Sequence, residues 1–483
     1  MRFNIVFHYL GLILTILGLF MLIPFLWSLI KGETCSLVFG ISTATTVGCG
    51  LLLWQLIKTD NNKLSRREAI MLVAGSWILV SVFGSLPYVI SGTFPNIMDA
   101  WFESVSGFTT TGATVMTSIE DKQQGILLWR GLTQWIGGMG IITLFVALFP
   151  LLGIGASHLV ESEMPGPQAE RLTPRIRDTA KTVWILYVGF SVFEFILLIV
   201  AGLSAFDAIT VTFGTMPTGG FAPVNMSIES YNSLFVDIVI IVFMTIAGVN
   251  FGLFYFLVWK RQVKQLIQNA EFRLYIMLIL ISTMLITVNL IASMDISFGE
   301  ALRHGSFQVV SIMTTTGFNT VDFNIWPAFA KAILLTLMII GACAGSTGGA
   351  LKVVRLLVLV KYAYRRIILA FNPRVVVPLK IGGTVLPENI ISGIIGMAIV
   401  YAATIFIGFL IMSAVGLDHV TALSSVIASA GNVGPGLNLV GPASNYEFIP
   451  LPGKFVLTVC MIVGRLELFT VFMIFIPPFW KWR

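Results

Sequence analysis

Charged and metal-binding side chains are scarce in this sequence. Only 11% of its residues are charged, and it contains four histidines and four cysteines. The cysteines lie in or near apolar stretches and lack the spacing of a zinc site, so we expect buried free thiols at Cys35, Cys49, Cys343 and Cys460. No P-loop or dinucleotide fingerprint is present, and no organic cofactor in this chain is expected.

Apolar residues make up the bulk of the chain. They account for 57% of it, and the mean hydropathy of +0.92 is far above that of a soluble domain. Apolar runs of about 18 residues or more recur, each long enough to cross a hydrocarbon core of roughly 30 Å. We therefore predict an all-α integral membrane protein. The first span, near 5–30, lacks an A-x-A-like cleavage site and is expected to be a retained helix.

Basic residues gather in alternate loops. Most of the 29 Lys and Arg residues lie at 58–67, 171–181, 260–273 and 352–380, or near the two ends of the chain. The positive-inside rule places these loops and both termini in the cytoplasm. This distribution explains the net charge of +6 without a nucleic-acid partner, and the loops are also suited to contact membrane lipid or a cytoplasmic protein.

Between consecutive basic loops the same unit recurs four times. Each unit consists of a span, a short half-helix that re-enters the membrane, and a second span. The half-helices are expected to open near Asp99, Asp207, Glu300 and Asp418, where a carboxylate can cap free N–H groups and interact with the positive end of the helix dipole. Two further spans precede the first unit.

The predicted fold is therefore four span–pore-helix–span repeats around a pseudo-fourfold pore, plus two extra N-terminal transmembrane helices. It has ten full crossings, expected at 5–30, 36–57, 68–90, 125–152, 182–201, 233–259, 274–292, 326–362, 390–415 and 452–479. The expected division of the chain is an N-terminal helix pair at 1–67, pore repeat 1 at 68–175, pore repeat 2 at 176–270, pore repeat 3 with an intramembrane gating loop at 271–380, and pore repeat 4 at 381–483.

A short polar segment with a glycine follows each half-helix. Such a segment cannot face lipid, because each unpaired backbone group would cost several kcal/mol there. Four copies predict carbonyl-bearing strands around one axis, as in an ion selectivity filter. The predicted filter residues are Thr110, Thr111, Gly112, Thr218, Gly219, Thr315, Thr316, Gly317, Asn432, Val433 and Gly434. We expect the glycines Gly112, Gly219, Gly317 and Gly434 to adopt backbone angles that other residues avoid.

The expected cargo of this filter is a potassium ion. The partially negative C-terminal ends of the half-helices would point at the filter and favour a cation. Carbonyl oxygens can replace the weakly held water of potassium, whereas divalent ions prefer carboxylate cages, and no ring of four carboxylates accompanies these segments. Because each segment has essentially one aligned glycine, one dominant site with moderate selectivity is predicted.

Two features on the inner side of the filter predict a gate. The stretch 341–349 is rich in glycine and hydroxyl residues, and glycine costs up to ~1 kcal/mol in a helix interior. We expect it to form a non-helical plug across the pore, with gate residues Gly345, Ser346, Thr347, Gly348 and Gly349.

Arg465 lies near the middle of the last predicted span. An arginine there costs ~2.5–3.5 kcal/mol unless it faces water or a partner. Projection into the pore and an ion pair with an acidic residue of another repeat are both open, and Glu467 is not its obvious mate on the same helix.

These segments resemble the four filters of the Trk/Ktr/HKT superfamily of potassium transporters. The resemblance rests on Phe108 to Thr114, Gly219 to Phe221, Thr314 to Phe318 and Asn432 to Gly436, and is strengthened by Trp135 to Gly140, Met164 to Pro167, Gly345 to Gly349 and Gly464 to Glu467. The N-terminal helix pair is similar to the bacterial Trk membrane subunit (TrkH/TrkG/TrkI type) rather than to the shorter Ktr type. The resemblance covers essentially the whole chain.

The resemblance implies potassium uptake across the bacterial inner membrane through a channel-like pore. It also implies a homodimer that works on a separate cytosolic ring of TrkA-type nucleotide-binding subunits, with the loops 259–273 and 352–380 as the docking surface. In that family the intramembrane loop acts as a gate, and Arg465 would project into the pore and repel cations.

Two other functions would require residues of a different kind. A proton- or sodium-coupled potassium symporter would need titratable residues along the path, and Glu194 is the main candidate. A polytopic membrane enzyme would need a nucleophile–base set or paired carboxylates on facing helices. The sequence contains no such set, so no enzymatic activity is predicted.

Overall fold

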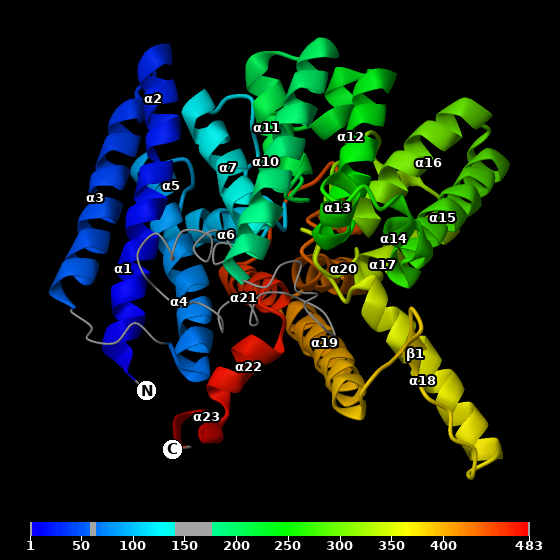
Figure 1. Cartoon of the computed structure of the whole chain (residues 1–483). Coiled ribbons are helices and arrows are strands. Elements are labelled where there is room, and N and C mark those ends of the chain that lie inside the picture. The colour runs from blue at the N-terminus through cyan, green and yellow to red at the C-terminus, as the bar shows by residue number, and fades with distance from the viewer. Residues whose placement is uncertain (1, 58–63, 141–175, 482–483) are drawn as a thin grey trace.

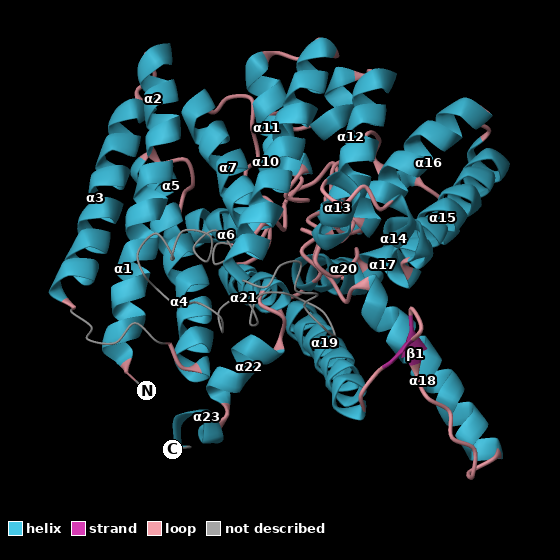
Figure 2. Cartoon of the chain, in the orientation of Figure 1, coloured by secondary structure: helices cyan, strands magenta, loops and turns pink. Residues whose placement is uncertain are grey.

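The computed structural model describes residues 2–57, 64–140 and 176–481. The described chain is mostly helical (Figures 1 and 2). Its strands are β1 (Lys380–Ile381) and β2 (Thr384–Val385), which form one small antiparallel hairpin. Predicted features at 141–175, including the end of the 125–152 span and the Met164 to Pro167 motif, lie outside the described residues.

The N-terminal pair packs closely because small residues line its contact. Helices α1 (Phe3–Phe20) and α2 (Leu22–Lys31) form one span, and α3 (Cys35–Leu56) returns alongside α1. A Cβ on Gly11 would lie 2.7 Å from the Gly50 carbonyl oxygen, and one on Gly50 would lie 2.6 Å from the Thr15 nitrogen. Removing side chains at these positions lets the two backbones approach, as is common between transmembrane helices. Helix α1 also packs on α4, which attaches the pair to the first repeat.

Four repeats follow the helix pair. Repeat 1 contains α4 (Arg66–Gly84), α5 (Leu86–Ile90), α6 (Ile97–Phe108) and α7 (Gln124–Gly138). Repeat 2 contains α10 (Ile176–Val200), α11 (Ala205–Thr215), α12 (Leu234–Ala247), α13 (Phe251–Val258) and α14 (Val263–Gln268). Repeat 3 contains α15 (Ala270–Met294), α16 (Phe298–Met313), α17 (Ala328–Ile340) and α18 (Val353–Phe371). Repeat 4 contains α19 (Glu388–Ala414), α20 (His419–Ala430), α21 (Leu451–Arg465), α22 (Phe469–Phe475) and α23 (Pro477–Lys481).

Each repeat has one pore helix, and in chain order these are α6, α11, α16 and α20. The four repeats close into a ring. The helix after each filter segment packs on the pore helix of the next repeat: α7 on α11, α12 on α16, α17 on α20, and α21 back on α6. These contacts confirm the predicted all-α membrane architecture of four span–pore-helix–span repeats with two extra N-terminal helices. The start of α1, the end of α23 and the end of α18 lie on the same side of the molecule (Figure 1).

The capping residues of three pore helices differ from the prediction. Asn96, Ser204 and Ser297 are the N-caps, and each accepts a hydrogen bond from the N–H three residues later. Short amide and hydroxyl side chains reach that N–H most directly, so the acidic residues fall in the first turn instead. Asp418 is itself the cap of α20, and hydrogen bonding to Thr421 is the largest influence that lowers the pKa of its carboxyl group.

The second spans of repeats 2, 3 and 4 are interrupted at the inner side of their filter segments. Between α12 and α13 the chain bends by 99°, and between α21 and α22 by 113°. Helix α17 ends at Ile340 and α18 begins at Val353, so 341–352 is non-helical, as predicted for 341–349. The interruption is therefore a feature of several repeats and not of the third alone. Arg465 is the last residue of α21, at the bend, so the predicted span at 452–479 is not one continuous helix.

These interruptions change the count of continuous spans. Among the described residues, six helices are long and apolar enough to cross a membrane, and the number rises to eight when each of the two bent pairs is counted as one span. The other two predicted crossings are 125–152, which is described only to residue 140, and 326–362, which the loop at 341–352 divides.

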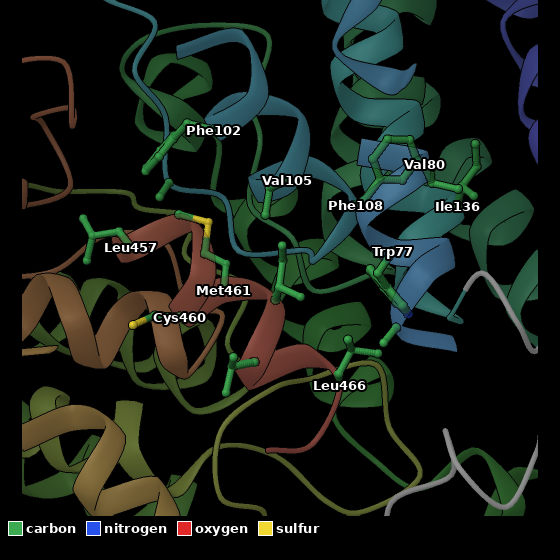
Figure 3. Packing of buried hydrophobic residues seen from close by; sticks show 14 of the residues in the cluster. Trp77, Val80, Phe102, Val105, Phe108, Ile136, Leu457, Cys460, Met461 and Leu466 are labelled. Carbon is green, nitrogen blue, oxygen red and sulfur yellow. The ribbon is translucent and has the colours of Figure 1, made fainter. Parts of the chain in front are cut away.

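Apolar side chains fill the contact between the last repeat and the first. Phe102 and Phe108 of α6 and Trp77 of α4 are buried together with Leu457 and Met461 of α21 (Figure 3). The cysteines agree with the expectation of free thiols, since Cys35, Cys343 and Cys460 are buried and Cys49 is partly buried.

Candidate functional site

All four filter segments have the same hydrogen bonds to their pore helices. At the first position of each segment, the N–H donates to the carbonyl of the residue three positions earlier. The first-position residues, which carry these N–H groups, are Thr110, Thr218, Thr315 and Asn432. At the second position, the N–H donates to the carbonyl of the residue five positions earlier, at 2.8–2.9 Å. The second-position residues, which carry these N–H groups, are Thr111, Gly219, Thr316 and Val433. Because both bonds recur in every repeat, the four segments can be aligned position by position.

The third position is a glycine with positive φ in every segment. These glycines are Gly112 (80°), Gly220 (78°), Gly317 (84°) and Gly434 (98°). The predicted alignment was therefore wrong by one residue in repeat 2, where Gly219 takes the second position and lacks a positive φ. Two adjacent glycines leave the register ambiguous in the sequence, and the hydrogen bonds to α11 decide it.

The first position has positive φ without being glycine. Its φ values are 54° at Thr110, 56° at Thr218, 61° at Thr315 and 53° at Asn432. A side chain in this region costs roughly 1–2 kcal/mol per residue. Four equivalent residues hold the strained conformation, which is a feature of binding sites when the surroundings enforce it.

The segments touch one another in cyclic order. A Cβ added to Gly112 would collide with the Gly219 carbonyl oxygen, and one on Gly220 with that of Thr316. A Cβ on Gly317 would collide with the Val433 oxygen, and one on Gly434 would lie 2.6 Å from the Thr111 oxygen. All the predicted filter residues therefore converge around one axis, and glycine is required there for space as well as for backbone angles.

The first-position carbonyls are buried without a protein donor. Within the described chain, the carbonyl oxygens of Thr110, Thr218, Thr315 and Asn432 accept no hydrogen bond, although these residues are at most 1% exposed. A buried carbonyl without a partner is destabilising, so such groups normally find a donor, water or an ion. Four of them around one axis are suited to replace the hydration shell of a monovalent cation.

A buried ion pair supports the outer end of the filter. Glu103 of α6 and Arg130 of α7 lie 2.6 Å apart, and Glu103 also accepts the Val115 N–H and the Thr114 hydroxyl. Arg130 donates to the Ala222 carbonyl at 3.0 Å, which joins the first segment to the second. This pair is not among the residues predicted from the sequence, although two charged residues within apolar helices were a signal for it.

A cavity opens on the third-position side of the filter. It has a volume of about 270 Å³, and residues of all four repeats line it, among them Gly112, Gly220, Asn319 and Gly434. Since a water molecule occupies roughly 30 Å³ in the liquid, a cation can keep its hydration shell here until it reaches the glycines.

The loop 341–352 contains the predicted gate residues and is named the gate loop for that prediction. It lies against the opposite side of the filter segments. The Gly349 N–H donates to the Thr315 hydroxyl at 2.8 Å, and the hydroxyls of Thr218 and Thr347 are 3.3 Å apart. The loop also contacts the interruption in repeat 2, where the Phe251 N–H donates to the Gly345 carbonyl at 3.0 Å. The predicted gate residues therefore lie directly beneath the first-position residues.

Arg465 holds the gate loop from repeat 4. Its guanidinium donates to the Thr347 carbonyl and to the carbonyls of Gly137 and Gly138 at the end of α7, each at 2.7 Å. It therefore connects repeats 4, 3 and 1 on the inner side of the filter. Glu467 pairs instead with Arg355 at the start of α18, at 2.7 Å.

Two further side chains hold the loop and were not identified in the sequence. The Glu271 carboxylate accepts the N–H groups of Ala344 at 2.7 Å and of Val354 at 3.1 Å, one toward each end of the loop. The Lys352 ammonium donates to the Gly348 carbonyl. A carboxylate at the first turn of an apolar span was the only signal for Glu271.

Glu194 is buried in repeat 2 and does not line the cavity outside the filter. It is fully buried on α10 beside Thr215, at the end of the pore helix of repeat 2. The structure therefore does not bring this candidate coupling residue into the filter.

Together, the ring of repeats and the converging carbonyls define a membrane protein with a single cation-filter axis. A family model described as "TrkH: Cation transport protein" matches residues 37–481. The chain belongs to this TrkH family of cation transport proteins.

Named relatives and a solved structure agree with this assignment. The chain is 37% identical to the Trk system potassium uptake protein TrkH of Escherichia coli (strain K12), over 100% of both chains. It is 32% identical to the Trk system potassium uptake protein TrkG of the same organism, over 99% of both. The crystal structure of the potassium transporter TrkH from Vibrio parahaemolyticus is similar, with a TM-score of 0.90 and 33% identity over 100% of both chains.

Proposed function

We propose that the protein takes up potassium across the bacterial inner membrane through a channel-like pore. The observation that carries this proposal is the ring of four buried first-position carbonyls without a protein donor. An inside-negative potential would drive a cation inward with ~2.3 kcal/mol per 100 mV. The relatives named as potassium uptake proteins support potassium as the cargo.

The proposed filter consists of the predicted residues with Gly220 added at the third position of repeat 2. The proposed gate consists of Gly345, Ser346, Thr347, Gly348 and Gly349 with Arg465. The non-helical loop lies against the inner side of the filter and is held there by the Arg465 guanidinium. This arrangement is suited to block the pore in the resting state. The predicted division at 1–67, 68–175, 176–270, 271–380 and 381–483 is retained as part of this proposal.

We further propose that the protein is a homodimer regulated by a cytosolic ring of TrkA-type nucleotide-binding subunits. Both termini would then be cytoplasmic, on the side where α18 ends (Figure 1). Helix α18 follows the gate loop directly, so a force on α18 would reach the loop through Val353. The exposed Tyr364, Ile367 and Phe371 on this helix support a docking role.

The test is potassium flux into proteoliposomes, with the same substitution at two glycines. Gly317→Ala places a methyl group against the Val433 carbonyl at positive φ and is expected to abolish potassium preference over sodium. Gly393→Ala is the matched control, because nothing lies within 4 Å of its added Cβ. Flux that follows voltage without a proton or sodium gradient supports a pore, whereas obligatory dependence on either ion would support a symporter. Equal ion preference in both variants would remove the filter from the proposal.

A further inference from the structure

The three carbonyl rings of the filter are not equivalent. We name them inner, middle and outer for the first, second and third positions of the segments. Within the described residues, all four inner carbonyls lack a protein donor, whereas one carbonyl in each of the other rings accepts a side-chain hydrogen bond. These engaged carbonyls belong to Gly219 in the middle ring and Gly434 in the outer ring.

Tyr446 engages the outer ring. Its hydroxyl donates to the Gly434 carbonyl at 2.7 Å, and its own N–H donates to the Thr114 carbonyl of repeat 1 at 2.8 Å. The side chain is 2% exposed, and its ring packs against Phe102 with centroids 5.8 Å apart. The hydrogen bond and the ring contact hold the hydroxyl at the Gly434 carbonyl, beside the cavity that Tyr446 helps to line.

Gln134 engages the middle ring from behind the second segment. Its amide donates to the Gly219 carbonyl at 2.6 Å and accepts the Phe221 N–H at 3.0 Å. A Cβ on Gly219 would lie 2.5 Å from the Gln134 side-chain carbon, so glycine at this position is what admits the amide. This accounts for the one segment with glycine at the second position.

We propose that Tyr446 and Gln134 set the ion affinity of the filter by each engaging one backbone carbonyl, so that only the inner ring offers four unengaged oxygens to a monovalent cation. This inference rests on the proposed potassium function. A carbonyl that accepts a hydrogen bond has one lone pair engaged by its donor, and the partial positive charge of the donor hydrogen weakens the attraction of that oxygen for a cation. The middle and outer rings are then three-oxygen positions that a cation crosses, and the inner ring is where it binds.

The test compares two tyrosine-to-phenylalanine variants in proteoliposome flux. Tyr446→Phe releases the Gly434 oxygen to the outer ring, and we expect the half-saturating potassium concentration to fall about threefold. The maximal rate should change little. The half-saturating concentration of rubidium should fall in the same way as that of potassium, and that of sodium should fall less. Tyr401→Phe is the matched control, because Tyr401 is also buried but its hydroxyl has no hydrogen-bond partner in the described chain.

The outcomes separate this inference from the function on which it rests. If the unmodified protein moves no potassium, the proposed function fails. If it does, and Tyr446→Phe leaves the half-saturating concentration unchanged or raises it, only the role of Tyr446 and Gln134 is overturned. Should Tyr446→Phe fail to reach the membrane, Gln134→Met tests the same idea at the middle ring, with the same expected fall and the same contradicting result.

Discussion

At the residue scale, Arg465 contacts several backbone carbonyls on the inner side of the filter segments with one side chain. A guanidinium has several donors in a fixed plane, and here they reach carbonyls of two other repeats at once. Lysine could not bridge the same groups, since its donors radiate from one nitrogen. The arrangement holds the gate loop through its backbone, so it does not depend on the loop's side chains.

Arg465→Ala is therefore expected to favour an open pore. Losing hydrogen bonds from a charged donor costs about 1.5–3 kcal/mol, which corresponds to about a tenfold or larger shift toward conduction. Potassium flux in proteoliposomes without any cytosolic partner measures this shift. Arg374→Ala, at an exposed position after α18, is the control. Unchanged flux at normal expression would exclude Arg465 from the gate.

At the element scale, the interruptions of α12, α17 and α21 near the same level decide where the chain can move. The α-helical hydrogen bonds stop there, so loops and side chains must satisfy the freed backbone groups, as expected inside a membrane. Glu271 does so for both ends of the gate loop. The loop is thus anchored at its ends and held in its middle by Arg465.

Glu271→Ala would leave two buried N–H groups without partners. At about 1–3 kcal/mol for each, the gate loop should loosen and the protein should unfold at a lower temperature. Hydrogen exchange of the Ala344 and Val354 amides is expected to quicken most. Glu388→Ala removes a carboxylate whose side chain is 70% exposed, and such surface pairs contribute about 0–1 kcal/mol. Equal exchange at 344 and 354 in both variants would contradict the anchoring role.

The elements that could be predicted are those with a local signal. The length of the apolar runs predicts the spans, and a glycine after each short half-helix predicts the filter segments. The interruptions of α12 and α21 lack the glycine-rich stretch that reveals 341–352, so they could not be predicted in this way. The register at Gly219 and Gly220 failed for a related reason, because only hydrogen bonds to α11 distinguish the two glycines.

At the scale of the whole molecule, the ring is closed by a buried ion pair between the last repeat and the first. Lys454 of α21 lies 2.6 Å from Asp99 of α6, and both side chains are at most 4% exposed. Arg303 of α16 and Asp237 of α12 form a similar pair, 2.7 Å apart, between repeats 3 and 2. The two pairs join residues 355 and 66 positions apart, so sequence spacing carried no signal for them.

Lys454→Met would leave the Asp99 carboxylate buried without its cation. We expect a loss of about 3–5 kcal/mol in unfolding free energy, and a lower midpoint in thermal unfolding of the detergent-solubilised protein. The double variant Lys454→Met with Asp99→Asn should recover most of this loss, because the unpaired charge is gone. Arg365→Met, in a more exposed pair, serves as control. A double variant as unstable as the single one would argue against the charge as the cause.

Since one polypeptide supplies every wall of the aperture, each quadrant can evolve independently. In an assembly of four identical subunits, a single codon change would place the same substitution at four positions around the opening. Here the quadrants already differ, with Thr-Thr-Gly, Thr-Gly-Gly, Thr-Thr-Gly and Asn-Val-Gly at corresponding positions. Selection can therefore change the opening one segment at a time and make it asymmetric, which strict rotational symmetry forbids.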